Sequence, residues 1–424
     1  MQLSVGSVPG SFLINEDYMT TSPSSRVSRW PVWLCWLAMV LDGFDLVVLG
    51  TVIPTLIKTG ELGFDAVGAT LVATISLVGV GAGALFIAPL SDRFGRRKLM
   101  VACVLWFSVF TLAVAWAPNV AVFGVFRFLA GVGLGACLPV ALAYMNDYAK
   151  AGSAGKSTTR TMTGYHVGAV ATAFLALLVI PDWRIMFVVG GIAGLVLAPF
   201  LWFKLPETLP AAETARTQEQ TGFRDLARKP YPLVAVAIAA ASFMGLLLVY
   251  GLNTWLPQLM ASAGYPVSAG LSLLLVLNLG AVAGLIIAGI LADKHGTKPI
   301  VLLWFGLSAA CLALLSIKVD NAFLLNALVF VTGVFVFSAQ VLVYAWVSQL
   351  FPARLRATAL GFAAGVGRVG AIAGPAVTGG LVAAGIAYPW GFYAFAAAGA
   401  LAVLALVAVP HAIAAARTAE EQVS

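Results

Sequence analysis

Twelve apolar stretches, each close to the length that crosses a lipid bilayer, run through almost the whole chain. A helix needs about 20 apolar residues to span the hydrocarbon core. The stretches cover residues 30–57, 64–90, 98–117, 119–145, 160–180, 184–205, 231–261, 267–292, 299–317, 321–350, 357–385 and 388–410. With 61% hydrophobic and only 10% charged residues, the chain has more apolar surface than a soluble fold can bury. The sequence therefore predicts an all-α polytopic membrane protein.

Positive charges lie mainly in alternate loops between these stretches. With the N-terminus in the cytoplasm, nineteen of the 24 Lys and Arg residues fall in cytoplasmic segments, and three, Lys58, Arg184 and Lys318, fall in external loops. Because loops rich in Lys and Arg stay on the cytoplasmic side, we expect both termini in the cytoplasm. The net charge of +7 is then a topology signal, so we expect a lipid bilayer as partner and no nucleic acid.

Nothing else in the chain points to processing or to a bound cofactor. Residues 1–29 are mostly polar and the stretch after them is too long for a signal peptide, so we expect no cleaved leader, with Met19 as an alternative start. The four cysteines all lie in apolar stretches, without the spacing of a disulfide framework or a metal site. We therefore expect no cofactor and no metal.

The longest polar segment between the apolar stretches divides them into two sets of six. The predicted divisions are a cytoplasmic tail (1–29), an N-terminal half (30–205), a cytoplasmic linker (206–230), a C-terminal half (231–410) and a second cytoplasmic tail (411–424). The halves echo each other, since Asp92 follows the second stretch and Asp293 follows the eighth, 201 residues later. Two related halves of this kind enclose a cavity near the membrane midplane and rock about it.

Residues 92–98, Asp-Arg-Phe-Gly-Arg-Arg-Lys, resemble the signature loop of the major facilitator superfamily. Arg127 and the glycine run at 131–135 also fit that superfamily. The resemblance covers nearly the whole chain and implies twelve transmembrane helices in two pseudo-symmetric six-helix halves. Ala88 departs from the pattern, which has glycine there, and the second copy of the loop lacks the arginine pair. We therefore do not expect the two copies of the loop to contribute equally to function.

Within that superfamily, three segments resemble the aromatic acid:proton symporters. They are Asp-Gly-Phe-Asp at 42–45, Asn-Thr-Trp-Leu-Pro at 253–257, and Gly-Arg-Val-Gly-Ala-Ile at 367–372 ahead of Gly-Pro. The resemblance implies a transporter of the bacterial cytoplasmic membrane that imports a benzoate-like or hydroxybenzoate-like anion together with protons. We expect it to act as a monomer.

Four charged residues lie deep within the apolar stretches: Asp42, Asp45, Arg127 and Arg368. A rise of about 1.5 Å per helical residue places all four within a few ångströms of the midplane. Their charges sum to zero, which a cavity of low dielectric tolerates. The aspartates either pair with the arginines to hold helices together or titrate. Because buried ion pairs add little stability, we assign proton coupling to the two aspartates as a pair.

Arginine offers a carboxylate two donors and offers an aromatic ring a flat face, so we expect Arg368 to hold the substrate carboxylate. Arg127 is expected to neutralise Asp42 or Asp45, with direct substrate contact as the alternative. His166 lies near the start of the fifth stretch. It is either a proton relay or a donor to substrate, or else a histidine in a helix contact.

A ring-shaped substrate also needs apolar walls and a few polar anchors. The candidates for these are Phe44, Tyr250, Asn253, Trp255, Gln340 and Tyr344. The candidates for a cytoplasmic gate are Asp92, Arg93, Arg96, Arg97, Asp147 and Asp293. In that gate we expect Asp92 to lie against a helix N-terminus, such as that of the eleventh span, and Asp147 to pair with a nearby arginine.

Other functions fit the sequence less well. An importer of another organic acid, such as a shikimate-like compound, and a drug:proton antiporter remain as alternatives. Export of cationic drugs favours acids without cationic partners in the cavity, whereas two buried arginines favour an anion. A membrane receptor would need a larger soluble domain than the linker offers. We expect no enzymatic activity, because the chain has no phosphate-binding Walker loop and no nucleophile–base constellation.

Overall fold

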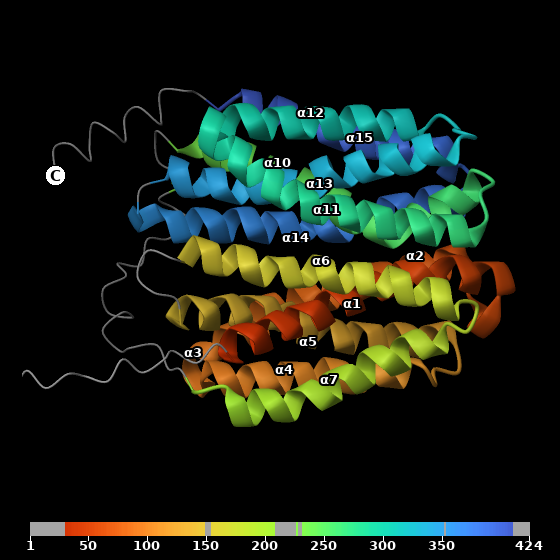
Figure 1. Ribbon diagram of the computed structural model, residues 1–424, viewed down its shortest axis with the longest axis horizontal. Helices are drawn as coiled ribbons and strands as arrows, with labels where there is room; N and C mark the ends of the chain where they lie inside the picture. Colours follow the sequence, from red (N-terminus) through yellow and green to blue (C-terminus); the bar gives the residue numbers. More distant parts are fainter. Residues whose placement is uncertain (1–29, 149–153, 208–225, 228–230, 352, 410–424) are drawn as a thin grey trace, which may run out of the picture.

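The computed structural model describes residues 30–148, 154–207, 226–227, 231–351 and 353–409 (Figure 1). The two predicted tails and most of the predicted linker lie outside the described residues. Twelve long helices fill the described ranges. They are α1 (Trp30–Thr59), α2 (Ala66–Ala82), α4 (Arg96–Val114), α5 (Val120–Tyr148), α6 (Ala154–Val179), α7 (Arg184–Lys204), α10 (Pro232–Ser262), α11 (Val267–His295), α12 (Thr297–Leu315), α13 (Ala322–Leu350), α14 (Ala353–Ala383) and α15 (Ala387–Val407).

These helices confirm the predicted all-α membrane fold, with boundaries that shift by a few residues. Eleven of the described spans are long and apolar enough to cross a bilayer. The twelfth helix, α6, has 26 residues but a shorter apolar part, Thr163–Val179. The second span continues beyond α2 through a wide turn, η3 (Gly83–Ile87), and a tight turn, η4 (Ala88–Leu90). Pro89 lies in that tight turn, where its missing amide hydrogen disfavours a regular α-helix.

The loop after the second helix of each half has the same backbone conformation. Gly95 precedes α4 with φ 93° and ψ 143°, and Gly296 precedes α12 with φ 85° and ψ 147°. Only glycine adopts these angles without strain, because a side chain would clash with the backbone. The two glycines are 201 residues apart, the same displacement as the sequence repeat. The repeat is therefore structural as well as sequential.

Glycines also allow equivalent helices to pack closely within each half. Gly79 of α2 and Gly83 of η3 place the second span directly on the backbone of α5, where an added Cβ would overlap a carbonyl group. Gly280 and Gly284, again 201 residues later, do the same for α11 on α13. Small residues at such contacts let membrane helices approach at backbone distance. The glycine run after Arg127 belongs to this packing, since Gly131 and Gly135 face α2 from α5.

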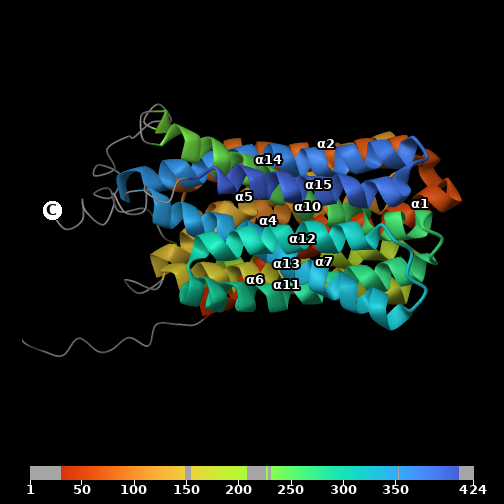
Figure 2. The same ribbon diagram turned by 90° about the horizontal axis from the view of Figure 1, so that it is seen from above.

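The helices of the C-terminal half lie above those of the N-terminal half in Figure 1, with α6 beside α11. Figure 2 shows α2 beside α14 at the opposite edge. We call the surface where α1, α2 and α6 meet α10, α11 and α14 the seam. We call the end where α1 begins and α15 ends the inner end, and the opposite end the outer end. At Gly50, α1 crosses α10 so closely that an added Cβ would overlap the backbone of Asn253.

The buried apolar side chains form two groups. One contains the outer part of the N-terminal half together with the C-terminal half, and the other contains the inner part of the N-terminal half. Among the described residues, the C-terminal half reaches this second group only through Tyr250 and Ile372. Apolar contact between the halves is therefore concentrated toward the outer end.

Candidate substrate and proton site

Asp45 and Arg127 form a buried ion pair inside the N-terminal half, with side chains 1% and 2% exposed. Nη1 of Arg127 lies 2.8 Å from Oδ2 of Asp45, and Nη2 donates to the backbone oxygen of Asp45 at 3.0 Å. The hydroxyl of Thr111 donates to Oδ1 of Asp45 at 2.7 Å. Both carboxylate oxygens are thus engaged by neighbouring helices, α4 and α5. The structure pairs Arg127 with Asp45, one of the two partners expected from the sequence.

Asp42 lies one turn earlier on α1, in a different environment. Its side chain is buried, and its Oδ1 has no hydrogen-bond partner among the described residues. Arg368 attracts the Asp42 carboxylate electrostatically, and Asp45 repels it. Arg368 belongs to α14 in the other half, so the interaction between Asp42 and Arg368 crosses the seam. Asp45 and Arg127 therefore form a direct ion pair, whereas Asp42 and Arg368 attract each other across the seam without one.

Arg368 is half-buried, and its Nη1 donates to the hydroxyl of Tyr250 on α10 at 3.3 Å. Tyr344 on α13 also interacts with it electrostatically. The side chains of Tyr250 and Tyr344 are half-buried as well. Arg368, Tyr250 and Tyr344 therefore form a polar group next to the seam that keeps some accessible surface.

Two glycines hold the arginine in this position. Gly367 lies against the side chain of Ser242, and Gly370 lies against the backbone of Phe243, with no room for a Cβ at either glycine. α14 therefore packs flush against α10, which brings Arg368 next to Tyr250. On α1, Gly43 similarly lies on the backbone of α6. The glycine between the two aspartates thus serves close helix approach.

A set of amide and hydroxyl groups lies one turn outward from Tyr250. Nδ2 of Asn278 on α11 donates to Oδ1 of Asn253 on α10 at 3.0 Å, and also to the backbone oxygen of Leu274 at 3.0 Å. The Tyr165 hydroxyl on α6 lies beside the amide of Asn253, close enough to interact with it, although neither group makes a hydrogen bond of regular geometry. We call Tyr165, Asn253 and Asn278 the amide cluster.

The remaining predicted substrate residues lie farther apart. The ring of Phe44 packs inside the N-terminal half, next to Gly190 of α7. Trp255 is fully buried against Gly379 of α14 and Thr70 of α2, where it fills the outer part of the seam. Neither side chain is among those that surround Arg368.

Gln340 and His166 are both buried near the seam. Nε2 of Gln340 donates to the hydroxyl of Ser242 at 3.1 Å. The His166 ring lies edge-on to Phe337 of α13, with ring centroids 5.4 Å apart. His166 thus lies in a contact between helices of the two halves, but its Nδ1 has no hydrogen-bond partner in the described part of the chain, so its role as proton relay or substrate donor stays a prediction. In that same part, no group of three or more His, Cys, Asp or Glu side chains could hold a metal ion.

The sequence matches the Major Facilitator Superfamily over residues 35–284 and 272–423. The chain belongs to this superfamily. It is 36% identical to the gentisate transporter of Corynebacterium glutamicum, over 88% of this chain and 86% of that protein. It is 31% identical to the benzoate transport protein of Acinetobacter baylyi, over 93% and 92% of the two chains. It also shares its fold with a D-xylose–proton symporter of known structure, with a TM-score of 0.71 at 18% identity over 89% and 96% of the chains.

The protein is therefore a major facilitator transporter related to aromatic acid transporters, and not an enzyme. In this transporter the signature loop makes its described contacts within one half. Arg97 donates through its backbone N–H to Oε1 of Glu207 at 3.0 Å and through Nη1 to the Leu205 backbone oxygen at 3.3 Å. Arg96 is half-buried at the start of α4, and Asp293 is exposed at the inner end. The side chains of Asp92, Arg93 and Asp147 lie outside the described part of the structure.

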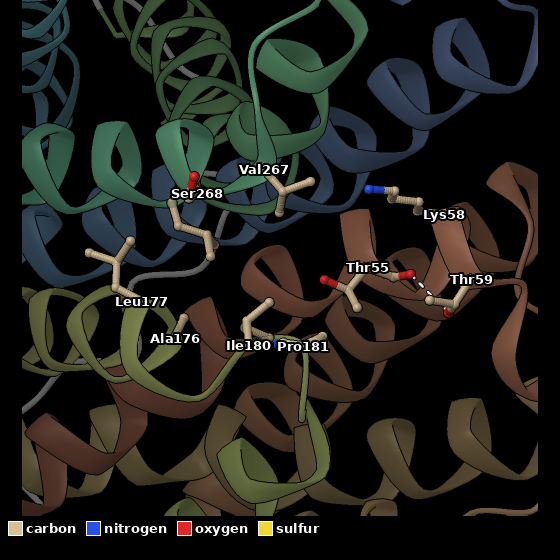
Figure 3. Close-up of a pocket in the computed structure, with 10 residues that line it drawn as sticks. Thr55, Lys58, Thr59, Ala176, Leu177, Ile180, Pro181, Val267 and Ser268 are labelled. Atoms are coloured by element: carbon tan, nitrogen blue, oxygen red, sulfur yellow. Dashed lines mark hydrogen bonds between the residues drawn. The ribbon is translucent and has the colours of Figure 1, made fainter.

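A pocket of about 300 Å³ lies at the outer end of the seam, between α1, α6 and α11 (Figure 3). It is lined by Thr55, Lys58, Thr59, Ala176, Leu177, Ile180, Pro181, Val267, Ser268 and Leu271. Along α1 this pocket begins roughly 20 Å beyond Asp42, given the rise of a helix. It is therefore separate from the buried charged residues of α1, α5 and α14.

Sequence reasoning did not single out Thr111, Tyr165 or Asn278. Asn278 carried a usable signal, because it is an amide within the apolar run of α11. Thr111 carried none, since a threonine in a membrane helix can satisfy its hydroxyl on its own backbone. Tyr165 stands directly before His166, so a search for polar residues around that histidine would have found it.

Proposed function

We propose that this transporter imports an aromatic carboxylate together with a proton by alternating access, with its inner end in the cytoplasm. The observation that carries the proposal is that a carboxylate and a guanidinium from opposite halves, Asp42 and Arg368, lie close enough across the seam to attract each other without a direct ion pair. An anion that binds at the seam would compete with Asp42 for Arg368. The printed substrates of the relatives, gentisate and benzoate, are aromatic carboxylates and support the same class of solute here.

Charge balance links the substrate to the proton. Without substrate, Asp42 and Arg368 neutralise each other. When a substrate carboxylate binds Arg368, the guanidinium is neutralised by the substrate, and an ionised Asp42 would be left as an unbalanced charge in a low-dielectric site. Burying such a charge costs several kcal/mol or more, whereas protonation of Asp42 removes it. The loaded transporter therefore carries one proton for each anion.

The environment of Asp45 supports a different role for that residue. Arg127 and Thr111 already engage both carboxylate oxygens of Asp45. All three residues belong to the N-terminal half, so these hydrogen bonds do not require contact with the C-terminal half. Protonation of Asp45 would leave Arg127 as an unpaired buried cation. We therefore assign the coupling proton to Asp42, and assign Asp45 and Arg127 to the stability of the N-terminal half.

Import with one proton also suits the membrane potential. Moving a monovalent anion into a negative-inside cell costs about 2.3 kcal/mol per 100 mV. One co-transported proton cancels that charge, so the pH gradient can drive accumulation without opposition from the potential. The excess of Lys and Arg in the inner segments supports the cytoplasmic orientation of the inner end.

The test is uptake of radiolabelled benzoate, gentisate, 4-hydroxybenzoate and shikimate into proteoliposomes under an imposed pH gradient. We expect the wild type to accumulate at least one of the aromatic acids. Asp42→Asn should still exchange labelled for unlabelled acid but should not accumulate it against the gradient. Asp320→Asn, which changes an exposed carboxylate in the loop before α13, should accumulate it like the wild type.

Two results would contradict the proposal. Uptake of shikimate alone would replace an aromatic substrate by another organic acid. Normal gradient-driven accumulation by Asp42→Asn would remove Asp42 from the coupling step.

A further inference from the structure

The amide cluster leaves one donor and two oxygens without hydrogen bonds at the centre of the seam. Nδ2 of Asn253, Oδ1 of Asn278 and the hydroxyl of Tyr165 are all buried, and each has no hydrogen-bond partner within the described residues. The side chains of Asn253 and Asn278 are 2% and 0% exposed. Buried polar atoms are almost always hydrogen-bonded, and leaving one unsatisfied costs about 1–3 kcal/mol. The Tyr165 hydroxyl and the Asn253 amide are neighbours, but the amide nitrogen has a second hydrogen to donate and Oδ1 of Asn278 has no donor, so these groups from three helices indicate a place prepared for a polar group.

The orientation of the two amides is determined by their contacts. Nδ2 of Asn278 donates to Leu274 on its own helix and to Oδ1 of Asn253, both at 3.0 Å. Turning either amide over would replace a donor–acceptor contact by a contact between like groups. The unpaired groups are therefore a donor on Asn253 and an acceptor on Asn278.

The amide cluster is next to the proposed carboxylate site. Tyr250 contacts Arg368, and Asn253 follows Tyr250 by three residues, which places both on one face of α10. One helical turn separates them, roughly the width of a benzene ring. Tyr165 lies near both Tyr250 and Arg368, so it approaches the same place from the N-terminal half.

We infer that the amide cluster recognises a hydroxyl group on the aromatic ring of the substrate, so that the transporter is selective for hydroxylated aromatic acids. The inference rests on the proposed function. A phenolic hydroxyl is both donor and acceptor, so it can donate to Oδ1 of Asn278 and accept from Nδ2 of Asn253. A second carboxylate would lack the donor, and a bare ring would satisfy neither amide.

A purely structural role is the competing explanation, because amides that bond across α10 and α11 also hold membrane helices together. The two roles differ in what they do to selectivity. Loss of a helix contact lowers the uptake of every substrate alike. Loss of a hydroxyl-binding site lowers the uptake of hydroxylated acids relative to benzoate, because only those acids lose a hydrogen bond.

The experiment measures the apparent affinities of 3-hydroxybenzoate, 4-hydroxybenzoate and benzoate by competition against a labelled transported acid in proteoliposomes. The wild type should prefer at least one hydroxybenzoate over benzoate by about 10- to 100-fold, as expected for one well-made pair of buried hydrogen bonds. Asn278→Leu should lower that ratio at least tenfold. Tyr165→Phe, which removes only a hydroxyl group and keeps the ring, should lower it less.

Thr332→Val is the matched control. Thr332 is fully buried on α13, where its hydroxyl donates to the Leu328 oxygen of its own helix and lies beside Cys311 of α12 in the same half. The affinity ratio of hydroxybenzoate to benzoate in Thr332→Val should equal that of the wild type. A wild-type ratio near one, or an equal loss for all three acids in both Asn278→Leu and Tyr165→Phe, would overturn the inference while leaving the proposed function intact. Failure of the wild type to transport any aromatic acid would instead overturn the proposed function, and the inference with it.

Discussion

The two halves of this transporter keep their buried charges in different ways. In the N-terminal half, Asp45 and Arg127 neutralise each other, and Thr111 engages the second carboxylate oxygen. In the C-terminal half, Arg368 contacts the neutral hydroxyl of Tyr250, and the acid that attracts it, Asp42, lies across the seam. The first pair is complete within one half, whereas the second exists only where the halves meet.

This difference separates structure from function. In the alternating-access cycle proposed above, a pair confined to one half would keep its geometry while the halves rock, so its energy would not change during transport. An attraction shared between the halves can be broken by their movement or by an anion that competes for the arginine. Asp42 and Arg368 are therefore suited to couple substrate binding to protonation, whereas Asp45 and Arg127 are suited to maintain the fold.

The comparison is tested most strongly by replacing each arginine with lysine. Arg368→Lys should lower the apparent affinity for the transported acid by about 100-fold, because lysine cannot offer a carboxylate two donors in one plane. Arg127→Lys should lower the thermal stability of the protein and change affinity by only a few-fold. Competition uptake and thermal unfolding in detergent give the two readouts. The comparison fails if Arg127→Lys proves to be the variant with the larger loss of affinity.

A double-mutant cycle at Asp45 and Arg127 tests the other side of the comparison, through stability rather than affinity. Removing one member, as in Asp45→Leu or Arg127→Leu, leaves a buried charge unpaired and should cost about 3–5 kcal/mol of stability. The double variant removes both charges and should recover much of that loss. Thermal unfolding of the four proteins measures this coupling. If the double variant is as unstable as the sum of the single variants, the pair does not act as a unit.

The signature loop should show a smaller effect, because its described contacts stay within one half. Oε2 of Glu207 lies 3.6 Å from Nε of Arg97, and both side chains are about one-quarter exposed. Glu207→Gln should lower stability by no more than about 1 kcal/mol, because solvent screens the pair. The turnover number should change less than about twofold. A large change in turnover at unchanged stability would instead assign this loop to the gate that the sequence predicted.

Lys298 offers a comparison in the other half. It follows Arg97 by 201 residues and donates through Nζ to the Val409 backbone oxygen at 2.6 Å, just as Arg97 donates to Leu205 at the end of α7. Lys298→Gln should therefore resemble Arg97→Gln in its effect on stability.

The smallest effect is expected at the outer end, where Glu61 accepts hydrogen bonds from Trp183 at 2.9 Å and from Arg184. These two bonds, that of Trp183 first, lower the pKa of Glu61 below its ordinary value of 4.5. A lowered pKa means that the ionised form stabilises the folded state above pH 4.5, and that this contribution disappears as the pH falls through the pKa of the folded protein.

Glu61→Gln should therefore be slightly less stable than the wild type at pH 7, by less than about 1 kcal/mol for so exposed a pair. The difference should shrink as the pH is lowered below 4.5. Thermal unfolding across that pH range measures it. A difference that grows toward low pH would contradict the assigned direction of the shift.

The pattern of apolar stretches was enough to predict the helices, because crossing a bilayer demands a continuous apolar segment whatever its neighbours are. The charges at 42, 45, 127 and 368 could be placed at one depth for the same reason. Their partners could not be predicted. Asp42 and Asp45 are three residues apart on one helix, so their different surroundings arise from α4, α5 and α14, which are distant in the sequence.

The direction of a side chain was also beyond reach of the sequence. Phe44, between the two aspartates, packs against Gly190 inside its own half, and Trp255 fills the outer seam. Both are apolar residues close to predicted binding residues, and helical spacing alone does not say which face of a helix meets the other half. The importance of Asn278 became visible only when its amide was found beside Asn253.

The sequence by itself determined the twelve-helix membrane fold, the repeat between its halves and the set of charges at its centre, because hydrophobicity and helix rise act along one segment at a time. Only the tertiary structure decided which carboxylate is fully paired and which faces the other half. That choice depends on contacts between helices, where a shift of one residue turns a side chain by about 100°.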